Sequence, residues 1–204
     1  MNTESLIKPV ALVDAKPYLR LKYSLDFCFA LLMLLCMAPL LLCVALLIRL
    51  ESKGPIFYLQ TRVGLNETPF QIYKFRTMVA GADKIGPLLT ETNDPRITRF
   101  GKLLRRTSID ELPQLLNILK GEMSFIGPRP EVPPIVADYT ERQRGVFQVR
   151  PGLSGWAQVN GRDELDIPTK LNLDLEYIAN LSLGMDFKIL CLTPLAVLSK
   201  RGVN

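Results

Sequence analysis

The sequence predicts a mainly helical α+β fold that is attached to a membrane, on three observations. A long apolar run without any charge, Phe27–Ile48, precedes a chain of more polar composition. Two later segments, "GPIFYLQTRVG" and "FQIYKFRTM", are rich in β-branched and aromatic residues, which predicts strands. Segments closer to the C-terminus carry apolar residues at helical spacing. The 204 residues are enough for one domain of ordinary size.

The apolar run is long enough to cross a bilayer, because it corresponds to roughly 33 Å of helix. Pro39, near its middle, removes one backbone hydrogen bond. Basic residues flank the run on both sides: Lys8, Lys16, Arg20 and Lys22 before it, and Arg49, Lys53 and Arg62 after it. Positive charge marks the cytoplasmic side of a membrane segment. We therefore predict a re-entrant helical hairpin at 23–50 that enters the membrane, breaks at Pro39 and returns. A basic tail (1–22) precedes it and a cytoplasmic domain (51–204) follows.

The cytoplasmic domain is predicted element by element. The two strand segments are separated by "LNETP" and predict a small β-hairpin. Residues 80–95 are punctuated by Gly, Asp and Pro and predict a loop. Residues 97–106 predict a basic amphipathic helix, which either lies on an anionic membrane surface or packs on the core with a solvated basic face. The remaining elements are a proline-rich extended segment (127–134), a glycine-rich structured loop (149–162) and two helices (171–180 and 187–200).

The composition excludes several kinds of site. The chain has no histidine, so a Ser-His-Asp or Cys-His nucleophile system and a histidine-ligated zinc site are excluded. Any metal would have oxygen ligands, as Mg²⁺ does. The four cysteines form no C-x-x-C pair, and we interpret them as buried apolar residues. The net charge of +5 fits an anionic partner, but no nucleic-acid motif is present and we expect no nucleic acid.

One stretch, "SIDELPQL", places two carboxylates side by side at a helix N-terminus. Pro113 fits the first turn of a helix, so a helix is predicted to start near Asp110. Ser108 and Glu111 also fit a capping box. The two acids by themselves are best explained as capping groups. In a functional interpretation, Asp110 is kept ionised by nearby arginines and attacks phosphorus, while Glu111 holds Mg²⁺.

Three motifs together resemble one known family. "KFRTM" (74–78), "SIDELPQLLNILKGEMSFIGPRP" (108–130) and "RPGLSGWAQVNGR" (150–162) look like those of the bacterial sugar transferase family, the monotopic phosphoglycosyl transferases. The resemblance extends from about Lys16 to the C-terminus. It implies transfer of a phospho-sugar from a UDP-sugar to polyprenyl phosphate with release of UMP, through a covalent enzyme intermediate and with Mg²⁺.

The resemblance also implies roles for individual residues. Asp110 matches the nucleophile of the family, and Glu111 matches its metal-binding partner. Five further charged positions match the surroundings of the family's substrate site: Lys74, Arg105, Arg129, Arg162 and Asp186. Taken singly, each also has a plain structural explanation, such as a loop anchor or an outward-facing strand residue. The family breaks its membrane helix at a Ser-Pro pair, whereas this chain has Ala38-Pro39 and lacks that hydroxyl.

Combined, the sequence predicts an α+β, mainly helical monotopic membrane enzyme with a re-entrant helical hairpin, a small β-hairpin and interfacial amphipathic helices. Its location would be the cytoplasmic face of the bacterial inner membrane. The expected partners are a UDP-sugar, polyprenyl phosphate and inner-membrane lipid. The sequence leaves open whether the chain forms a homo-oligomer. The alternative is a non-catalytic scaffold that uses the same membrane anchor to recruit partners. Such a scaffold would release no UMP.

Overall fold

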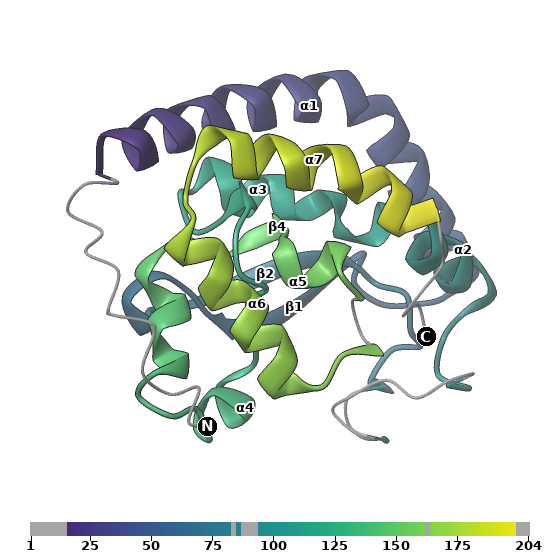
Figure 1. Cartoon of the computed structure of the whole chain (residues 1–204). Coiled ribbons are helices and arrows are strands. Elements are labelled where there is room, and N and C mark those ends of the chain that lie inside the picture. Colours follow the sequence, from purple (N-terminus) through teal and green to yellow (C-terminus); the bar gives the residue numbers. More distant parts are fainter. Residues whose placement is uncertain (1–15, 83–84, 87–93, 162–163, 199–204) are drawn as a thin grey trace.

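The computed structural model describes residues 16–82, 85–86, 94–161 and 164–198 (Figure 1). The first half contains α1 (Lys16–Glu51), β1 (Phe57–Val63), the 3-10 helix η2 (Leu65–Glu67), β2 (Pro69–Phe75), α2 (Arg99–Thr107), the 3-10 helix η4 (Ile109–Gln114) and α3 (Leu115–Leu119). The second half contains β3 (Ser124–Ile126), α4 (Pro133–Val136), the 3-10 helix η5 (Gln143–Gln148), β4 (Gly152–Ser154), α5 (Trp156–Val159), α6 (Ile167–Ala179) and α7 (Leu183–Leu198). The α+β class is confirmed.

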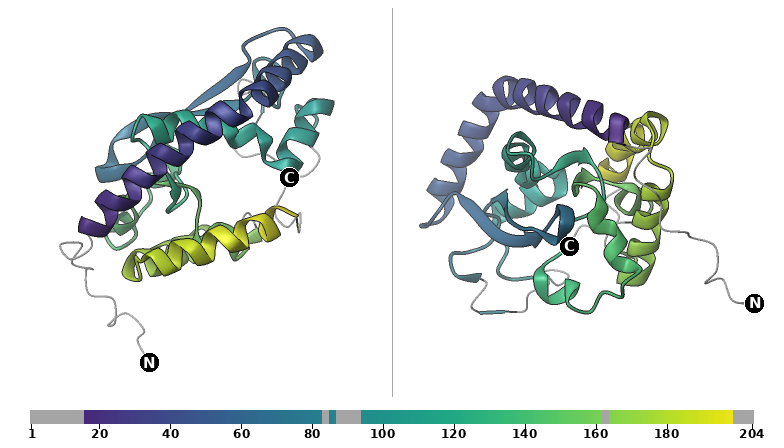
Figure 2. Two further views of the ribbon diagram at one scale, coloured as in Figure 1. Left: turned by 90° about the horizontal axis from the view of Figure 1, so that it is seen from above. Right: turned by 90° about the vertical axis from the view of Figure 1, so that its left-hand side faces the viewer.

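Helix α1 continues through Pro39, so the predicted break is not found. Instead α1 is one helix that bends on its way across the domain (Figures 1 and 2). The physical reason is that Pro39 removes only one hydrogen bond, while side chains on both sides of it pack on the domain. Met33 and Leu34 contact the cluster that contains Leu115, and Val44 and Ile48 lie in a cluster with Phe75 and Leu104. By length and composition, α1 is the one described helix that qualifies as a membrane span.

The N-terminal part of α1 carries buried polar side chains, although it was predicted as the end of a basic tail. Helix α1 begins at Lys16, and both Lys22 and Asp26 are buried. Lys22 Nζ and Tyr18 OH donate to Oδ2 of Asp186 on α7, each at 2.5 Å. Ser124 Oγ on β3 donates to Asp26 Oδ2 at 2.6 Å. Buried charges need such partners, so these bonds fix the start of α1 against the domain.

The β-hairpin is confirmed, with β1 and β2 antiparallel and Tyr58 opposite Lys74. A second, parallel pair of strands, β3 and β4, was not predicted. These strands are only three residues long and lie next to glycines and prolines. A Cβ added at Gly152 would lie 2.1 Å from the backbone nitrogen of Gly127. The glycines therefore allow the two backbones to approach, which a pattern of apolar residues cannot indicate.

The turn between α2 and η4 differs from the predicted capping box. The basic helix is present as α2, with Thr98 at its N-cap accepting a hydrogen bond from the Gly101 amide. Ser108 ends α2 in the left-handed conformation (φ 55°, ψ 18°) and makes no side-chain cap. Asp110 and Glu111 start a 3-10 helix instead of an α-helix. The side chain of Glu111 is consequently available to another partner.

Two helices close the fold, as predicted, although both begin earlier than expected. Helices α6 and α7 contribute Tyr177, Ile178 and Ile189 to the largest buried cluster. In Figure 1, α7 lies below α1 and above the small strands, and Figure 2 shows that the two helices are close only at their N-terminal ends. Asn117 of α3 is fully buried and joins α3 to β2, since its side chain accepts a hydrogen bond from the Tyr73 amide and donates one to the Gln71 carbonyl. That link holds α3 on the hairpin, and α3 directly follows the 3-10 helix that carries the two acids.

Candidate active site

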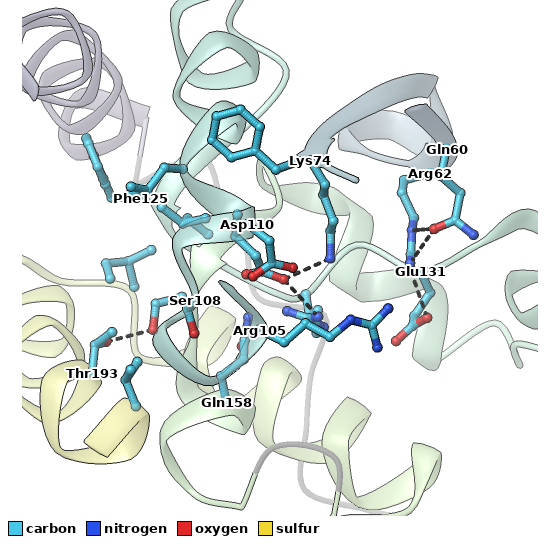
Figure 3. Close-up of a pocket in the computed structure, with 18 of the residues that line it drawn as sticks. Gln60, Arg62, Lys74, Arg105, Ser108, Asp110, Phe125, Glu131, Gln158 and Thr193 are labelled. Atoms are coloured by element: carbon cyan, nitrogen blue, oxygen red, sulfur yellow. Dashed lines mark hydrogen bonds and ion pairs between the residues drawn. The ribbon is translucent and has the colours of Figure 1, made fainter. Parts of the chain in front are cut away.

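A cavity of about 1370 Å³ extends over the centre of the molecule and contains the two adjacent acids (Figure 3). Asp110 lies between two different surroundings. Lys74 and Arg62 from the hairpin are on one side, and Phe125 of β3 and Thr193 of α7 are on the other. Lys74, Arg105, Arg129 and Asp186 also line the cavity. The tertiary structure thus brings distant motifs to one place.

Glu111 lies between two cations. Its Oε1 atom is 2.8 Å from Lys74 Nζ and 3.4 Å from Arg129 NH2. Burial opposes ionisation of Glu111, but the charges of Lys74 and Arg129 outweigh it, so the pKa of Glu111 lies well below its usual value. Glu111 is therefore a permanent anion that joins β2, η4 and the "GPRP" turn.

Asp110 has a different environment from its neighbour. Only 8% of the residue is exposed. Burial and the negative charge of Glu111 raise the pKa of Asp110 to about 6, and the positive charges of Lys74 and Arg105 oppose this rise. The basic residues act in the expected direction, since Lys74 and Arg105 lower the pKa of Asp110, but burial is the larger effect and the pKa is raised overall. A carboxylate with a pKa in this range is more basic than a surface aspartate, which suits it to attack an electrophile.

Each basic side chain is positioned by its own element. Lys74 projects from β2 opposite Tyr58. Arg105 belongs to α2, and its Nε donates to Thr77 Oγ1 at 2.9 Å. The turn that carries Arg129 is held by β1, since Arg62 NH1 donates to the Pro130 carbonyl at 2.9 Å and the Val63 amide donates to the Glu131 carbonyl at 3.0 Å.

Asp186 is placed away from the cations that surround Glu111. Its Oδ1 accepts from Tyr177 OH at 2.7 Å, and its Oδ2 accepts from Tyr18 and Lys22. These bonds connect α1, α6 and α7, so the observed contacts of Asp186 are those of an anchor between helices. Arg162, the remaining predicted residue, lies outside the described residues.

Two buried polar residues of the cavity were missed in the sequence. Asp174 is 3% exposed, and its Oδ1 atom is buried without a hydrogen-bond partner among the described residues. Burial is the main reason why its pKa is raised to about 7. Gln158 is also buried, on α5. A signal for Asp174 was present, because it falls on the apolar stripe of α6 with Leu171, Leu175 and Ile178, where a carboxylate is unusual.

A magnesium ion fits the chemistry of the adjacent acids, although they form only a pair. No group of three potential metal-ligating side chains occurs among the described residues. Mg²⁺ in phosphate-processing sites is commonly held by one or two carboxylates, with substrate phosphates and water completing its shell. Glu111 and Asp110 supply hard oxygen donors of that kind in a cavity that Lys74, Arg105 and Arg129 also line.

The fold and the site define a membrane-associated domain with a carboxylate pair in a basic cavity, an arrangement that suits phosphoryl chemistry. The chain belongs to the bacterial sugar transferase family, whose model matches residues 17–200. It is 44% identical over 184 residues to the sugar transferase EpsL of Bacillus subtilis, with 90% of each chain covered.

Two longer relatives are also similar. The UDP-glucose:undecaprenyl-phosphate glucose-1-phosphate transferase of Escherichia coli is 44% identical over 85% of this chain and 39% of its own length. The UDP-N-acetylgalactosamine-undecaprenyl-phosphate N-acetylgalactosaminephosphotransferase of Aeromonas hydrophila is 41% identical over 95% of this chain and 47% of its own length. The chain thus spans less than half the length of these two relatives.

The titration of Asp174 predicts a pH-dependent difference in stability. Its pKa rises from the ordinary 3.8 in the unfolded chain to about 7 in the folded protein. Wild type therefore loses stability as pH rises from about 4 through about 7. Asp174→Asn has no carboxyl group at this position to ionise, so its free energy of unfolding does not show this loss. We expect the free energy of unfolding of the variant, relative to wild type, to be higher at pH 8 than at pH 5 by on the order of 2 kcal/mol.

Denaturant unfolding in detergent micelles at the two pH values measures this difference. The matched control is Asp138→Asn, an exposed aspartate, for which the change between the two pH values should stay below about 0.5 kcal/mol. An equal or reversed pH trend in Asp174→Asn would show that Asp174 is ionised in the folded protein at pH 5.

Proposed function

We propose that this protein transfers a phospho-sugar from a UDP-sugar to polyprenyl phosphate and releases UMP. The observation that carries the proposal is the buried Asp110 beside the Lys74–Glu111–Arg129 cluster, in the cavity of a family member. The names of the Escherichia coli and Aeromonas relatives state UDP-sugar donors and an undecaprenyl-phosphate acceptor. The product would start the assembly of a surface polysaccharide or glycoconjugate.

The reaction proceeds in two displacements at one phosphorus. An oxygen of Asp110 attacks the β-phosphorus of the UDP-sugar, and the bond from that phosphorus to the bridging oxygen breaks. UMP leaves with the bonding electron pair, and an aspartyl phospho-sugar forms. A phosphate oxygen of the polyprenyl phosphate then attacks the same phosphorus, and the Asp110 carboxylate leaves with the electrons of its bond. The product is a polyprenyl diphosphate sugar, and Asp110 is regenerated.

The basic side chains stabilise the charge of both displacements. Lys74, Arg105 and Arg129 line the cavity around Asp110, and preorganised cations of this kind neutralise phosphate oxygens in the transition state. Glu111 keeps Lys74 and Arg129 in place. Glu111, assisted by Asp110, would hold Mg²⁺, which supplies further neutralisation of the diphosphate when it is bound.

The structure of α1 supports a re-entrant attachment to the cytoplasmic face of the bacterial inner membrane. Contacts near both ends of α1 are made to the same domain: Lys22 pairs with Asp186, and Glu51 accepts from the Phe100 amide. A spanning helix would place these two ends on opposite sides of the membrane. Apolar side chains such as Leu35 and Leu42 are exposed between them. The bent middle of α1 would therefore dip into the bilayer, while the polar domain stays at the headgroup level.

Removal of the nucleophile is the first test of this proposal. Asp110→Asn should lower transfer at least a thousandfold, because an amide oxygen cannot form the aspartyl intermediate, while the fold is retained. The assay follows UMP release from a panel of UDP-sugars with polyprenyl phosphate in micelles. Asp138→Asn, an exposed position, is the control. If Asp110→Asn turns over at a tenth of the wild-type rate or more, Asp110 is not the nucleophile. If the wild-type protein itself releases no UMP, the non-catalytic scaffold is the better explanation.

A metal titration tests the role of Glu111. Chelation with EDTA should stop transfer and added Mg²⁺ should restore it, because the carboxylate oxygens are ligands that Mg²⁺ prefers. Glu111→Gln should lose at least about a hundredfold in activity at saturating Mg²⁺, since it loses a ligand and leaves Lys74 without its partner. The binding of Mg²⁺ to wild type and Asp110→Asn is measured in parallel by calorimetry with a UDP-sugar present. Full activity in EDTA would contradict this role.

The membrane path is tested by accessibility. Single cysteines at Thr3 and Lys53, in a background without Cys28, Cys36, Cys43 and Cys191, should both be protected from an impermeant thiol reagent in intact cells. Both should react after the inner membrane is permeabilised, because both ends of α1 face the cytoplasm. Labelling of the Thr3 site alone in intact cells would establish an ordinary span.

A further inference from the structure

The central cavity does not end at the charged residues but continues between α1 and α7. Besides Asp110 and the cations, its lining includes Leu25 and Phe29 of α1 and Phe187 and Leu190 of α7. These side chains are exposed in the folded chain, with 57% of Phe29 and 54% of Leu190 accessible. One end of the cavity is thus strongly charged and the other strongly apolar.

The apolar part is a built groove and not a chance gap between two helices. Lys22 and Tyr18 of α1 are bonded to Asp186 of α7, which clamps the two helices where they start. From this clamp the helices diverge toward their C-terminal ends, as the two views of Figure 2 agree. The cavity lining between the two helices runs from Lys22 and Asp186 at this clamp to Met33 and Val197, and this part of the cavity is the groove.

The groove is continuous with the candidate active site. Phe125 lies on the side of Asp110 that faces α1, and Thr193 of α7 lies on the same side (Figure 3). Thr193 Oγ1 is bonded to Ser154 Oγ at 2.7 Å, so its polar atom is engaged and α7 is fixed to β4. A ligand in the groove would reach Asp110 without crossing the hairpin that supplies Lys74.

Two classes of ligand differ in how well they match a cavity with one charged end and one apolar end. A nucleotide sugar is polar along its whole length and has no group for the apolar half. A lipid phosphate has an anionic end for Lys74 and Arg129 and a long hydrocarbon chain for the groove. The groove residues lie on one face of α1 (Leu21, Leu25 and Phe29), whereas Phe27, Leu32 and Leu35 do not line the cavity and face elsewhere.

We infer that the groove between α1 and α7 binds the hydrocarbon chain of the lipid phosphate acceptor, next to the Lys22–Asp186 clamp, and delivers its phosphate to Asp110. This inference rests on the proposed function, since it assigns the site of the second substrate. It also explains why the polar anchor of α1 is buried in an otherwise apolar helix: the anchor sets the width of the groove.

Matched double variants separate the groove from general contact with the membrane. Phe29→Ser with Leu190→Ser removes two groove side chains, and Phe27→Ser with Leu195→Ser removes two equivalent side chains of α1 and α7 that do not line the cavity. Phe27 is 47% and Leu195 is 63% exposed, so both doubles lose comparable apolar surface. We expect only the groove double to raise the KM for a long-chain polyprenyl phosphate, by about tenfold, the change that 1.4 kcal/mol produces.

A half-reaction distinguishes failure of this inference from failure of the proposed function. The burst of UMP from a UDP-sugar without acceptor reports the first displacement alone. A variant with an unchanged burst and a raised KM for polyprenyl phosphate is therefore impaired in the use of the acceptor. A short-chain isoprenoid phosphate should show a much smaller difference between wild type and the groove double. If wild type gives no UMP with or without acceptor, the proposed function fails. If it gives UMP and both doubles raise the KM equally, or neither does, the groove assignment is overturned.

A second measurement covers the case in which the groove double does not fold. Wild-type protein in lipid nanodiscs is irradiated with a polyprenyl phosphate analogue that carries a diazirine in its chain, and labelled peptides are mapped by mass spectrometry. Labelling of residues 18–33 and 183–197 that excess unlabelled polyprenyl phosphate displaces supports the groove. Labelling spread over the outer face of α1, without displacement, would show that bilayer lipid alone occupies this surface.

Discussion

The carboxylate of Glu111 is the point at which three segments of the chain meet. It pairs with Lys74 from the hairpin and with Arg129 from the turn after β3, and it belongs to the 3-10 helix that follows α2. A buried carboxylate and two cations are each costly to remove from water, and their mutual proximity offsets that cost. The site therefore cannot form until the separate motifs are brought together, and once formed it holds them.

The properties of Asp110 follow from this arrangement. Its neighbour is fixed as an anion, so Asp110 experiences negative charge in addition to burial, and its pKa rises to about 6. Lys74 and Arg105 prevent a larger rise and keep the carboxylate charged near neutral pH. One residue thus serves as the permanent anion and the other as the more basic carboxylate. This division of roles between adjacent acids arises from what each side chain faces.

Helix α1 has a polar face that is bonded to the domain and an apolar face that is exposed. Its inner face carries Tyr18, Lys22 and Asp26, all bonded to the domain, and its outer face carries exposed leucines. Because the buried polar groups would lose their partners if the helix left the domain, α1 is held along the surface, where it bends on its way across the domain (Figure 2). The same anchors place α1 beside α7, where the apolar groove opens toward Asp110. Membrane attachment and the shape of the cavity therefore depend on the same contacts.

The sequence alone determined the mainly helical class, the hairpin and the basic helix, and it singled out the adjacent acids Asp110 and Glu111, because these depend on local patterns and on motifs that are contiguous. It did not determine that α1 stays continuous at Pro39, since side-chain packing on both sides of the proline compensates for one lost hydrogen bond. It also gave Ser108 a capping role that the left-handed turn excludes. Three features depend on residues that are distant in the chain. They are the contacts of Asp186 with Tyr18 and Lys22, the burial of Asp174, and the ion pair between Lys74 and Glu111. Only the tertiary structure decided them, because the energy of a buried charge depends on which partners the fold brings to it.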